Sequence, residues 1–296
     1  MQTIERRTFL KAAAIAGGAV LTGGRVSLGQ AQSQKPRLLK AVQYNMLPRD
    51  LKDKEKFALA RKCGFEGIEV EFDDGLDEKA AAELGKLAAG EGTPIHSIVF
   101  GGWGTPLSDP RAEVADKGIA GMQKCLRNAK AMGAGSVLLV PAIVTETVSY
   151  ADAYKRSQEN VRKLIPTAKE TGVVIAVEIV WNKFLLSPLE FARYVDEFQS
   201  PFVRAYFDTG NIILFGFAQD WIRTLGKRTV RIHLKDFKRQ GNQWVNLLDG
   251  DVNWKEVRKA LAEVGYEGYL TPELSGGDEA YLKDLSKRID KIVAGV

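Results

Sequence analysis

The sequence predicts an α/β protein that folds as a single (β/α)8 TIM barrel. Eight short segments rich in Val, Ile and aromatic residues alternate with eight helical patterns, which is typical of parallel strands joined by crossover helices. Eight such units within the 265 residues after position 31 favour a closed barrel over an open doubly wound sheet. The predicted strands are 38–44, 67–72, 94–100, 136–140, 174–179, 203–208, 230–234 and 269–273.

The predicted helices carry end signals in the sequence. Ser187 precedes Pro188, which suits the first helical position, and Asn253 stands directly before the apolar pattern that begins at Trp254. Four helices are followed by a glycine that can take the left-handed conformation needed to turn the chain toward the next strand: Gly64, Gly133, Gly172 and Gly265. The predicted helices are 50–63, 76–90, 111–132, 151–172, 187–199, 217–226, 253–264 and 278–293.

Composition excludes several classes of protein. Hydrophobic residues make up 45% of the 296 residues and charged residues 27%, as in ordinary globular proteins. Two cysteines exclude a disulfide scaffold and a cysteine zinc ribbon, and two histidines exclude an imidazole cluster. Cys63 and Cys125 lie in helical patterns, so we expect two buried apolar side chains. No glycine-rich phosphate loop follows the first predicted strand, which argues against nucleotide-binding folds.

Residues 1–31 have the pattern of an export signal. Arg6-Arg7 is followed by a short run of Ala and Gly, and Gly29-Gln30-Ala31 fits a cleavage site. The arginine pair resembles a twin-arginine signal in particular, which implies a periplasmic or exported protein. The apolar run is too short for a membrane span. Three of the five net positive charges lie in this segment, so the basic balance is no argument for nucleic-acid binding.

Four side chains that suit a metal ion lie at the ends of successive predicted strands. These are Glu178, Asp208, His233 and Glu273, each about one βα unit from the next. Because the carboxyl ends of barrel strands carry the active site, the four side chains are expected to ring one end of the barrel. Three carboxylates and one imidazole suit Mn²⁺ first, with Mg²⁺, Co²⁺ or Zn²⁺ as alternatives.

The motifs around these four residues resemble a known superfamily. They read Val-Glu-Ile at 177–179, Phe-Asp-Thr-Gly-Asn at 207–211, Ile-His-Leu-Lys-Asp at 232–236 and Thr-Pro-Glu at 271–273. This set is similar to the xylose isomerase-like TIM barrels, and most of all to their sugar phosphate isomerase/epimerase and ketose 3-epimerase group. The resemblance spans 37–296, so the predicted domains are a signal peptide at 1–31 and a barrel at 32–296. It implies that the four residues hold one divalent ion, usually Mn²⁺, and that Glu178 and Glu273 act as acid and base.

The chemistry of the four residues fits a sugar isomerase or epimerase. Removing a proton beside a carbonyl gives an enediolate, which a metal ion stabilises while two carboxylates move the proton. A free ketose or keto-sugar fits an exported enzyme better than a phosphorylated sugar. The alternative is a lyase or hydrolase that uses the same enediolate to split a 3-keto-glycoside. A repair endonuclease on this barrel would need more histidines, and an intact ligand set argues against a purely sugar-binding barrel. The oligomeric state, including a homo-oligomer, stays open.

Two further positions follow from the family pattern. The group often carries an Arg six residues after the metal His, which is Arg239 here, although a solvated surface charge explains this residue equally well. It also carries a His three residues after the metal Asp, where this chain has Asn211. Asn211 can hydrogen-bond a sugar hydroxyl but cannot shuttle a proton near neutral pH.

Other substrate contacts are predicted from position alone. Trp103 and Trp181 lie in loops after the third and fifth strands and could stack on a sugar, or simply pack locally. His96 lies in the third strand and is expected more often as a hydrogen-bonded core residue than as a ligand. Glu69 and Glu71 alternate with apolar residues in the second strand, and Glu71 is preferred as a site residue because it lies nearer the carboxyl end.

Overall fold

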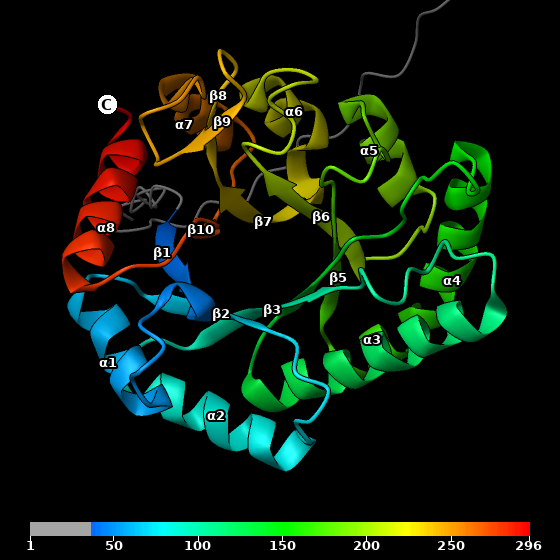
Figure 1. The fold of residues 1–296 in the computed structure, drawn as a ribbon, viewed down its shortest axis with the longest axis horizontal. Coiled ribbons are helices and arrows are strands. Elements are labelled where there is room, and N and C mark those ends of the chain that lie inside the picture. The colour runs from blue at the N-terminus through cyan, green and yellow to red at the C-terminus, as the bar shows by residue number, and fades with distance from the viewer. Residues whose placement is uncertain (1–36) are drawn as a thin grey trace, which may run out of the picture. The chain divides into compact units, whose positions relative to one another are not determined.

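The structure, a computed structural model that describes residues 37–296, contains a closed barrel of eight parallel strands (Figure 1). The predicted fold is confirmed. Around the barrel the strands follow the order β1-β10-β7-β6-β5-β4-β3-β2. Their bounds are β1 (Leu38–Gln43), β2 (Gly67–Glu71), β3 (Ile95–Gly101), β4 (Ser136–Leu139), β5 (Val174–Glu178), β6 (Val203–Asp208), β7 (Thr229–Leu234) and β10 (Gly268–Pro272).

Eight α-helices alternate with these strands and surround the barrel (Figure 1). They are α1 (Asp53–Lys62), α2 (Glu78–Gly90), α3 (Ala112–Met132), α4 (Tyr150–Thr171), α5 (Pro188–Asp196), α6 (Ala218–Leu225), α7 (Trp254–Glu263) and α8 (Glu279–Ala294). The predicted end signals act as expected: the Asn253 side chain accepts a hydrogen bond from the Glu256 amide, and Gly133 follows α3 with a φ of 83°. None of these helices is long and apolar enough to cross a membrane.

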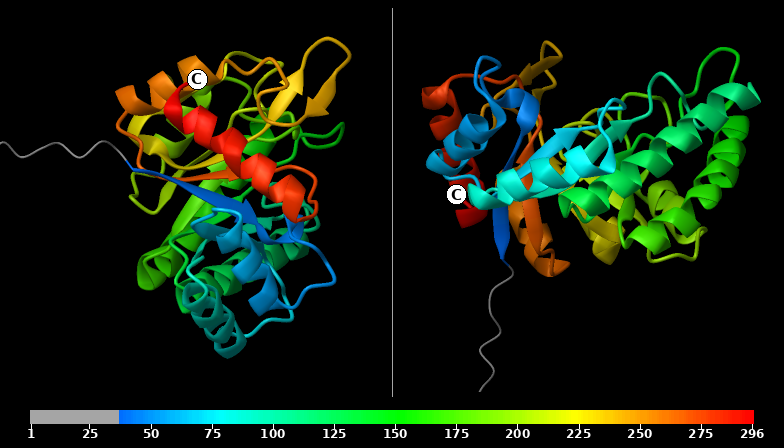
Figure 2. Two further views of the ribbon diagram at one scale, coloured as in Figure 1. Left: turned by 90° about the vertical axis from the view of Figure 1, so that its left-hand side faces the viewer. Right: turned by 90° about the horizontal axis from the view of Figure 1, so that it is seen from below.

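The loop between β7 and α7 holds a small element that the sequence did not predict. It is the antiparallel hairpin of β8 (Asp236–Lys238) and β9 (Gln243–Val245). Figure 2 shows this hairpin extending beyond the barrel at the end to which the strands point. It therefore stands beside the carboxyl ends of the strands, where a barrel carries its active site.

Side chains of one strand alternate between the two faces of the barrel wall. Along β6, Ala205 and Phe207 join the large core beneath the helices, whereas Tyr206 belongs to a separate small apolar cluster with Leu138 and Ala176. The barrel interior also contains buried polar side chains, and these lead to the site. Cys63 and Cys125 are buried and unbridged, as expected. The predicted signal at 1–31 lies outside the described residues.

Candidate metal centre and active site

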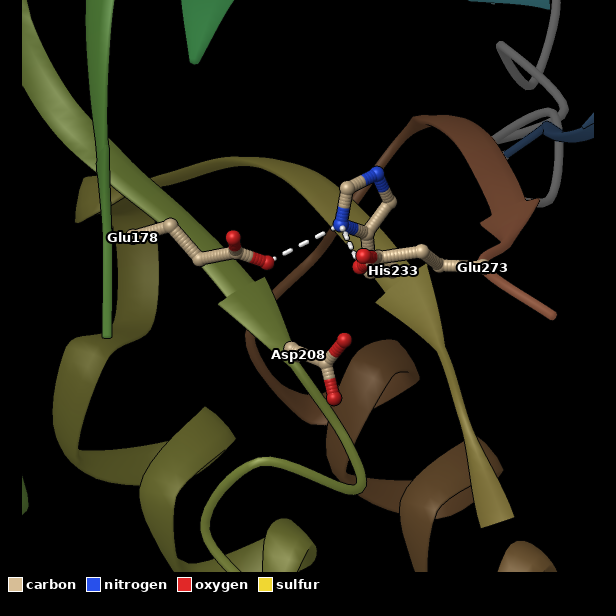
Figure 3. Close-up of side chains that lie close together, drawn as sticks. All are labelled: Glu178, Asp208, His233 and Glu273. Atoms are coloured by element: carbon tan, nitrogen blue, oxygen red, sulfur yellow. Dashed lines mark hydrogen bonds and ion pairs between the residues drawn. The ribbon is translucent and has the colours of Figure 1, made fainter. Parts of the chain in front are cut away.

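The structure brings together the four residues predicted at the strand ends. Glu178 ends β5, Asp208 ends β6, His233 is the penultimate residue of β7, and Glu273 directly follows β10. These strands are consecutive neighbours in the barrel wall, so their carboxyl ends lie side by side. One ligand atom from each side chain lies within 4.8 Å of those of the other three (Figure 3).

His233 Nδ1 lies between two of the carboxylates. It is 2.9 Å from Glu178 Oε1 and 3.0 Å from Glu273 Oε2, and Figure 3 shows the two glutamates approaching it from either side. Glu178, Asp208 and His233 are buried, whereas the Glu273 side chain is 35% exposed. The cluster therefore opens toward solvent on the side of Glu273.

Asp208 presents one satisfied and one unsatisfied oxygen. Its Oδ1 accepts hydrogen bonds from the backbone amides of Gly210 (2.7 Å) and Asn211 (2.8 Å), which fix the carboxylate at the end of β6. Its Oδ2 is buried and has no hydrogen-bond partner within 37–296. A buried anionic oxygen without a hydrogen bond is costly unless a cation lies nearby, such as the Lys235 ammonium at 3.5 Å or a bound metal ion.

Lys235, two residues after His233, lies beside the cluster. Its Nζ is 2.7 Å from Glu273 Oε2 and 3.5 Å from Asp208 Oδ2, and it donates to Asn211 Oδ1 at 3.3 Å. Burial alone would lower the pKa of Lys235, but Asp208 and Glu273 hold it above its usual range. Lys235 is therefore a fixed positive charge at the edge of the cluster.

The two glutamates have pKa values displaced in opposite directions. Burial raises the pKa of Glu178 to about 7, although His233 opposes the shift. Burial also acts to raise the pKa of Glu273, but His233 and Lys235 outweigh it and bring the pKa to about 2. Two carboxylates separated in this way are suited to different roles in proton transfer.

The donor set fits a divalent cation. Three carboxylates and an imidazole offer oxygen and nitrogen ligands without a thiolate, and Lys235 alone offsets only part of their negative charge. Burial raises the pKa of Asp208, which means that the isolated cluster disfavours its charge. A divalent ion held by Glu178, Asp208, His233 and Glu273 would remove this cost.

A fourth carboxylate, Glu69, lies behind His233. Its Oε2 accepts from His233 Nε2 at 2.6 Å, so the imidazole is held between acidic groups at both nitrogens. The sequence favoured Glu71 over Glu69 as the site residue of β2, whereas the structure places Glu69, and not Glu71, against His233. Glu71 lies at the exposed end of the strand, where it accepts a hydrogen bond from Asn45.

His96 is a core residue rather than part of the cluster. Its ring stacks on Tyr269 with centroids 4.1 Å apart, and its Nε2 lies 3.2 Å from Thr271 Oγ1. Burial and the nearby Arg231 lower the pKa of His96 to about 3, so the ring is neutral. The structure therefore supports the core interpretation and not a role in substrate binding.

Asn211 lies beside Asp208 and Lys235, and Trp181 contacts Asn211. Besides holding Asp208 through its backbone, Asn211 donates from Nδ2 to the carbonyl of Ile179 at 3.1 Å. Trp181 donates from its indole to the carbonyl of Asn211 at 3.1 Å and leaves 48% of its surface exposed. Asn211 belongs to the loop that follows β6, and Trp181, from the loop that follows β5, packs against it.

Trp103 and Arg239 lie elsewhere. Trp103 lines a separate depression with Phe72 and Phe100. The Arg239 guanidinium donates to the carbonyls of Ile213 (3.1 Å) and Gly216 (3.4 Å), and thus ties the hairpin region to the loop before α6. In this conformation neither side chain contacts the four-residue cluster.

A cavity of about 630 Å³ opens above Glu273 and Lys235. The hairpin forms one wall through Trp244, which is 44% exposed and packs against Trp181 with ring centroids 5.2 Å apart. Trp244 was not predicted as a site residue, although Gly241-Asn242 in the connection between β8 and β9 is a turn signal. The other walls include Gln43, Asn45, Asn246, Leu274, Ser275 and Tyr281.

Comparison with known proteins agrees with the fold. Residues 57–292 match the family described as Xylose isomerase-like TIM barrel. The chain belongs to this family. The match spans the described barrel from α1 to α8 and includes all four residues of the cluster.

Named relatives within this group are sugar epimerases. SgbU of Escherichia coli (strain K12), whose name provisionally assigns it L-ribulose-5-phosphate 3-epimerase activity, is 26% identical over 246 residues, covering 77% of this chain and 85% of SgbU. The D-psicose 3-epimerase of Enterocloster bolteae is 32% identical over 125 residues, covering 40% of this chain and 39% of that protein. Epimerases are isomerases, so the prediction of an isomerase-class enzyme is confirmed.

Solved structures share the barrel at lower identity. A D-psicose 3-epimerase solved in the presence of D-fructose superposes with a TM-score of 0.73 at 20% identity, covering 87% of this chain and all of that one. The 3-keto-D-glucoside 4-epimerase YcjR of E. coli superposes with a TM-score of 0.69 at 16% identity, covering 88% of this chain and all of YcjR. At these identities the likeness supports the fold alone.

Proposed function

We propose that this protein is a divalent-metal-dependent epimerase or isomerase that acts on an unphosphorylated ketose or keto-sugar through an enediolate. The observation that carries the proposal is the convergence of Glu178, Asp208, His233 and Glu273 within 4.8 Å at the carboxyl end of the barrel. Mn²⁺ is the proposed ion. When bound, it would polarise the substrate carbonyl and stabilise the negative charge of the enediolate.

The proposed division of labour follows from the two glutamates. Glu178 and Glu273 flank the cluster, so a sugar carbon between them presents one face to each carboxylate. Removal of a proton by one and return by the other inverts the carbon.

Lys235 and Asn211 complete the polar surroundings. The Lys235 ammonium lies against Glu273 and Asp208, so it can donate a hydrogen bond to a sugar oxygen beside the reacting carbon. Because its two carboxylate partners already fix the Lys235 side chain, little conformational entropy is lost when it binds a substrate. Asn211, linked to Lys235 at 3.3 Å, limits the direction in which the ammonium points.

The cavity argues for a substrate without a phosphate group. Of the described residues that line it, Lys235 is the one cation, and its charge is already shared with two carboxylates. Phosphate sites normally offer an Arg, a cluster of cations or a helix N-terminus. The proposed export of the protein, through residues 1–31, points the same way, because phosphorylated sugars are kept in the cytoplasm.

A second candidate is cleavage of a 3-keto-glycoside on the same residues. The cavity volume lies within the roughly 300–1,000 Å³ of pockets that hold drug-sized ligands. It extends from Glu273 to Trp244 and Tyr281, so a substituent on the sugar would have room and aromatic surface. Elimination from the enediolate would then expel the group at C1 instead of returning the proton to the opposite face.

One experiment separates these reactions. The Mn²⁺-loaded protein is incubated in D₂O with a panel of free ketoses and 3-keto-glucosides, and NMR follows deuterium uptake and release of the aglycone. Epimerisation predicts deuterium at an inverted carbon, and elimination predicts free aglycone. No exchange with any substrate would contradict an enediolate mechanism.

Two matched variants test the roles of the glutamates. Glu178→Gln and Glu273→Gln should each lower turnover by about 100-fold or more, the usual scale for loss of a general base, while retaining some metal binding. Glu71→Gln removes the same charge at the rim of the barrel and should leave turnover unchanged. Normal turnover in both metal-loaded site variants would contradict the two-carboxylate mechanism.

Export is tested separately. N-terminal sequencing of native protein from a periplasmic extract should begin after Ala31. Recovery of only the full-length chain from the cytoplasm would contradict the export proposal and weaken the argument for an unphosphorylated substrate.

A further inference from the structure

Glu69 is a buried carboxylate that the proposed proton transfers do not use. It lies in the middle of β2 between Ile68 and Val70 and is 1% exposed. A charged group in such a position is costly unless hydrogen bonds compensate it. The hydrogen bonds of Glu69 therefore need to be accounted for one by one.

Three other strands supply donors to Glu69. Tyr206 of β6 donates from its hydroxyl to Oε1 at 2.7 Å, while His233 Nε2 of β7 (2.6 Å) and Gln43 Nε2 of β1 (3.1 Å) donate to Oε2. Both oxygens of Glu69 are therefore held by groups from three strands in the barrel interior.

The orientation of the His233 ring depends on this contact. With Nε2–H donating to Glu69, the opposite nitrogen Nδ1 faces Glu178 and Glu273, on the side where all four ligand atoms converge. The Tyr206 ring packs against the imidazole with centroids 4.3 Å apart and limits its rotation. These contacts fix the orientation of the His233 ring.

We propose that Glu69 is a positioning residue that holds His233 through Nε2–H and thereby presents Nδ1 to a divalent cation. The inference rests on the metal site of the proposed function and adds a residue that does not touch the ion. Carboxylates placed behind a metal-bound histidine in this way fix its tautomer and raise its basicity. The same arrangement would keep His233 from turning toward the barrel interior when the ion leaves.

The other buried histidine shows that burial alone does not require such a partner. His96 is 4% exposed and has Thr271 at Nε2, and its Nδ1 has no hydrogen-bond partner in the part of the chain that the structure describes. Neither of its ring nitrogens contacts a carboxylate. Of the two histidines, the one whose Nδ1 faces the ligand cluster is the one with a carboxylate at Nε2.

Metal affinity provides the first test. Titration with Mn²⁺, followed by electron paramagnetic resonance, should show 10- to 100-fold weaker binding to Glu69→Gln than to the unmodified chain. Glu71→Gln is the matched control, because it removes one negative charge from the same strand at its exposed end, and it should bind Mn²⁺ as the unmodified chain does. Equal affinity of Glu69→Gln and the unmodified chain would overturn the role of Glu69.

The tautomer of His233 provides the second test and needs no variant that might fail to fold. The chain has two histidines, so ¹⁵N labelling of histidine gives two sets of ring signals. In the Zn²⁺-loaded protein, His233 should carry its proton on Nε2 and bind the ion through Nδ1. A proton on Nδ1 with the ion on Nε2 would overturn the proposal. An unmodified chain that binds no divalent ion would overturn the metal site as well.

Discussion

Two buried aspartates lie at the carboxyl end of the barrel, Asp208 at the end of β6 and Asp236 at the start of the hairpin after β7. Both are fully buried, but their oxygens differ in what they contact. Asp236 accepts five hydrogen bonds, shared between its two oxygens: from the backbone amides of Phe237, Leu248, Gly250 and Val252 and from the indole of Trp254. Asp208 has two backbone donors on one oxygen and no hydrogen bond on the other.

The difference separates a structural carboxylate from one available to a ligand. Asp236 uses its whole hydrogen-bonding capacity to fix the loop from which Trp244 reaches over the cavity. Asp208 has one oxygen without a hydrogen bond, with only the Lys235 ammonium nearby at 3.5 Å, and this oxygen is available to a ligand. Burial raises the pKa of both residues, so burial alone does not distinguish these roles. The satisfied or unsatisfied state of the second oxygen does.

The largest effect on stability is expected at Asp236. In Asp236→Asn, an amide NH₂ replaces one carboxylate oxygen and leaves at least two of the five donors without an acceptor. At about 1–3 kcal/mol for each unsatisfied buried donor, the free energy of unfolding should fall by about 3 kcal/mol or more. Chemical denaturation measures this change. The folded fraction should still bind one Mn²⁺, and an unchanged stability would contradict the anchoring role.

The same substitution at Asp208 should change stability little and Mn²⁺ affinity strongly. In Asp208→Asn, the carbonyl oxygen of the new amide would keep the two backbone hydrogen bonds, and the variant would lose a charge that the ion-free cluster disfavours. We expect the free energy of unfolding without metal to change by less than about 1 kcal/mol. Mn²⁺ affinity should fall by about 100-fold or more. Loss of a residue that only hydrogen-bonds to a metal ligand already lowers metal affinity by about 10- to 100-fold, and Asp208 is proposed to bind the ion itself. Unchanged affinity would assign the ion to other residues.

A smaller effect is expected where the two regions touch. A Cβ on Gly210, two residues after Asp208, would lie 2.6 Å from Lys235 Cβ and 2.9 Å from the Trp244 ring. Gly210→Ala should therefore displace the hairpin and cost about 1–3 kcal/mol. Gly104→Ala is the control, because a Cβ there meets no atom within 4 Å. Equal thermal stability of the two variants would contradict close packing of the hairpin on the β6 loop.

The comparison also shows what the sequence could and could not predict. The strands, the helices and their terminal glycines are local signals, and the four site residues follow from the rule that barrel sites lie at strand ends. Asp208 and Asp236 both stand at or near the ends of predicted strands, and no local feature separates them. Their roles depend on donors from residues 210–211 and 237–254, which only the folded loops bring into contact.

Glu69 and Trp244 were missed for the same reason. Glu69 and Glu71 alternate on one strand, and the choice between them depends on Tyr206 and His233, which are 137 and 164 residues from Glu69 in sequence. An acid inside a strand expected to be buried on both faces was nevertheless a usable signal, because it requires a partner. Trp244 enters the site through the β8–β9 hairpin, whose connecting residues include the turn signal Gly241-Asn242, but which face of the hairpin meets the cavity depends on the folded loops.

Anomalous diffraction from crystals of the protein grown with Mn²⁺ tests the central claim most directly. The account predicts one strong peak about 2.0–2.6 Å from ligand atoms of Glu178, Asp208, Glu273 and His233, with Nδ1 as the histidine ligand. It predicts no peak beside Asp236, whose oxygens are already satisfied. A peak at Asp236, or its absence from the four-residue cluster at saturating Mn²⁺, would contradict the assignment of the metal centre.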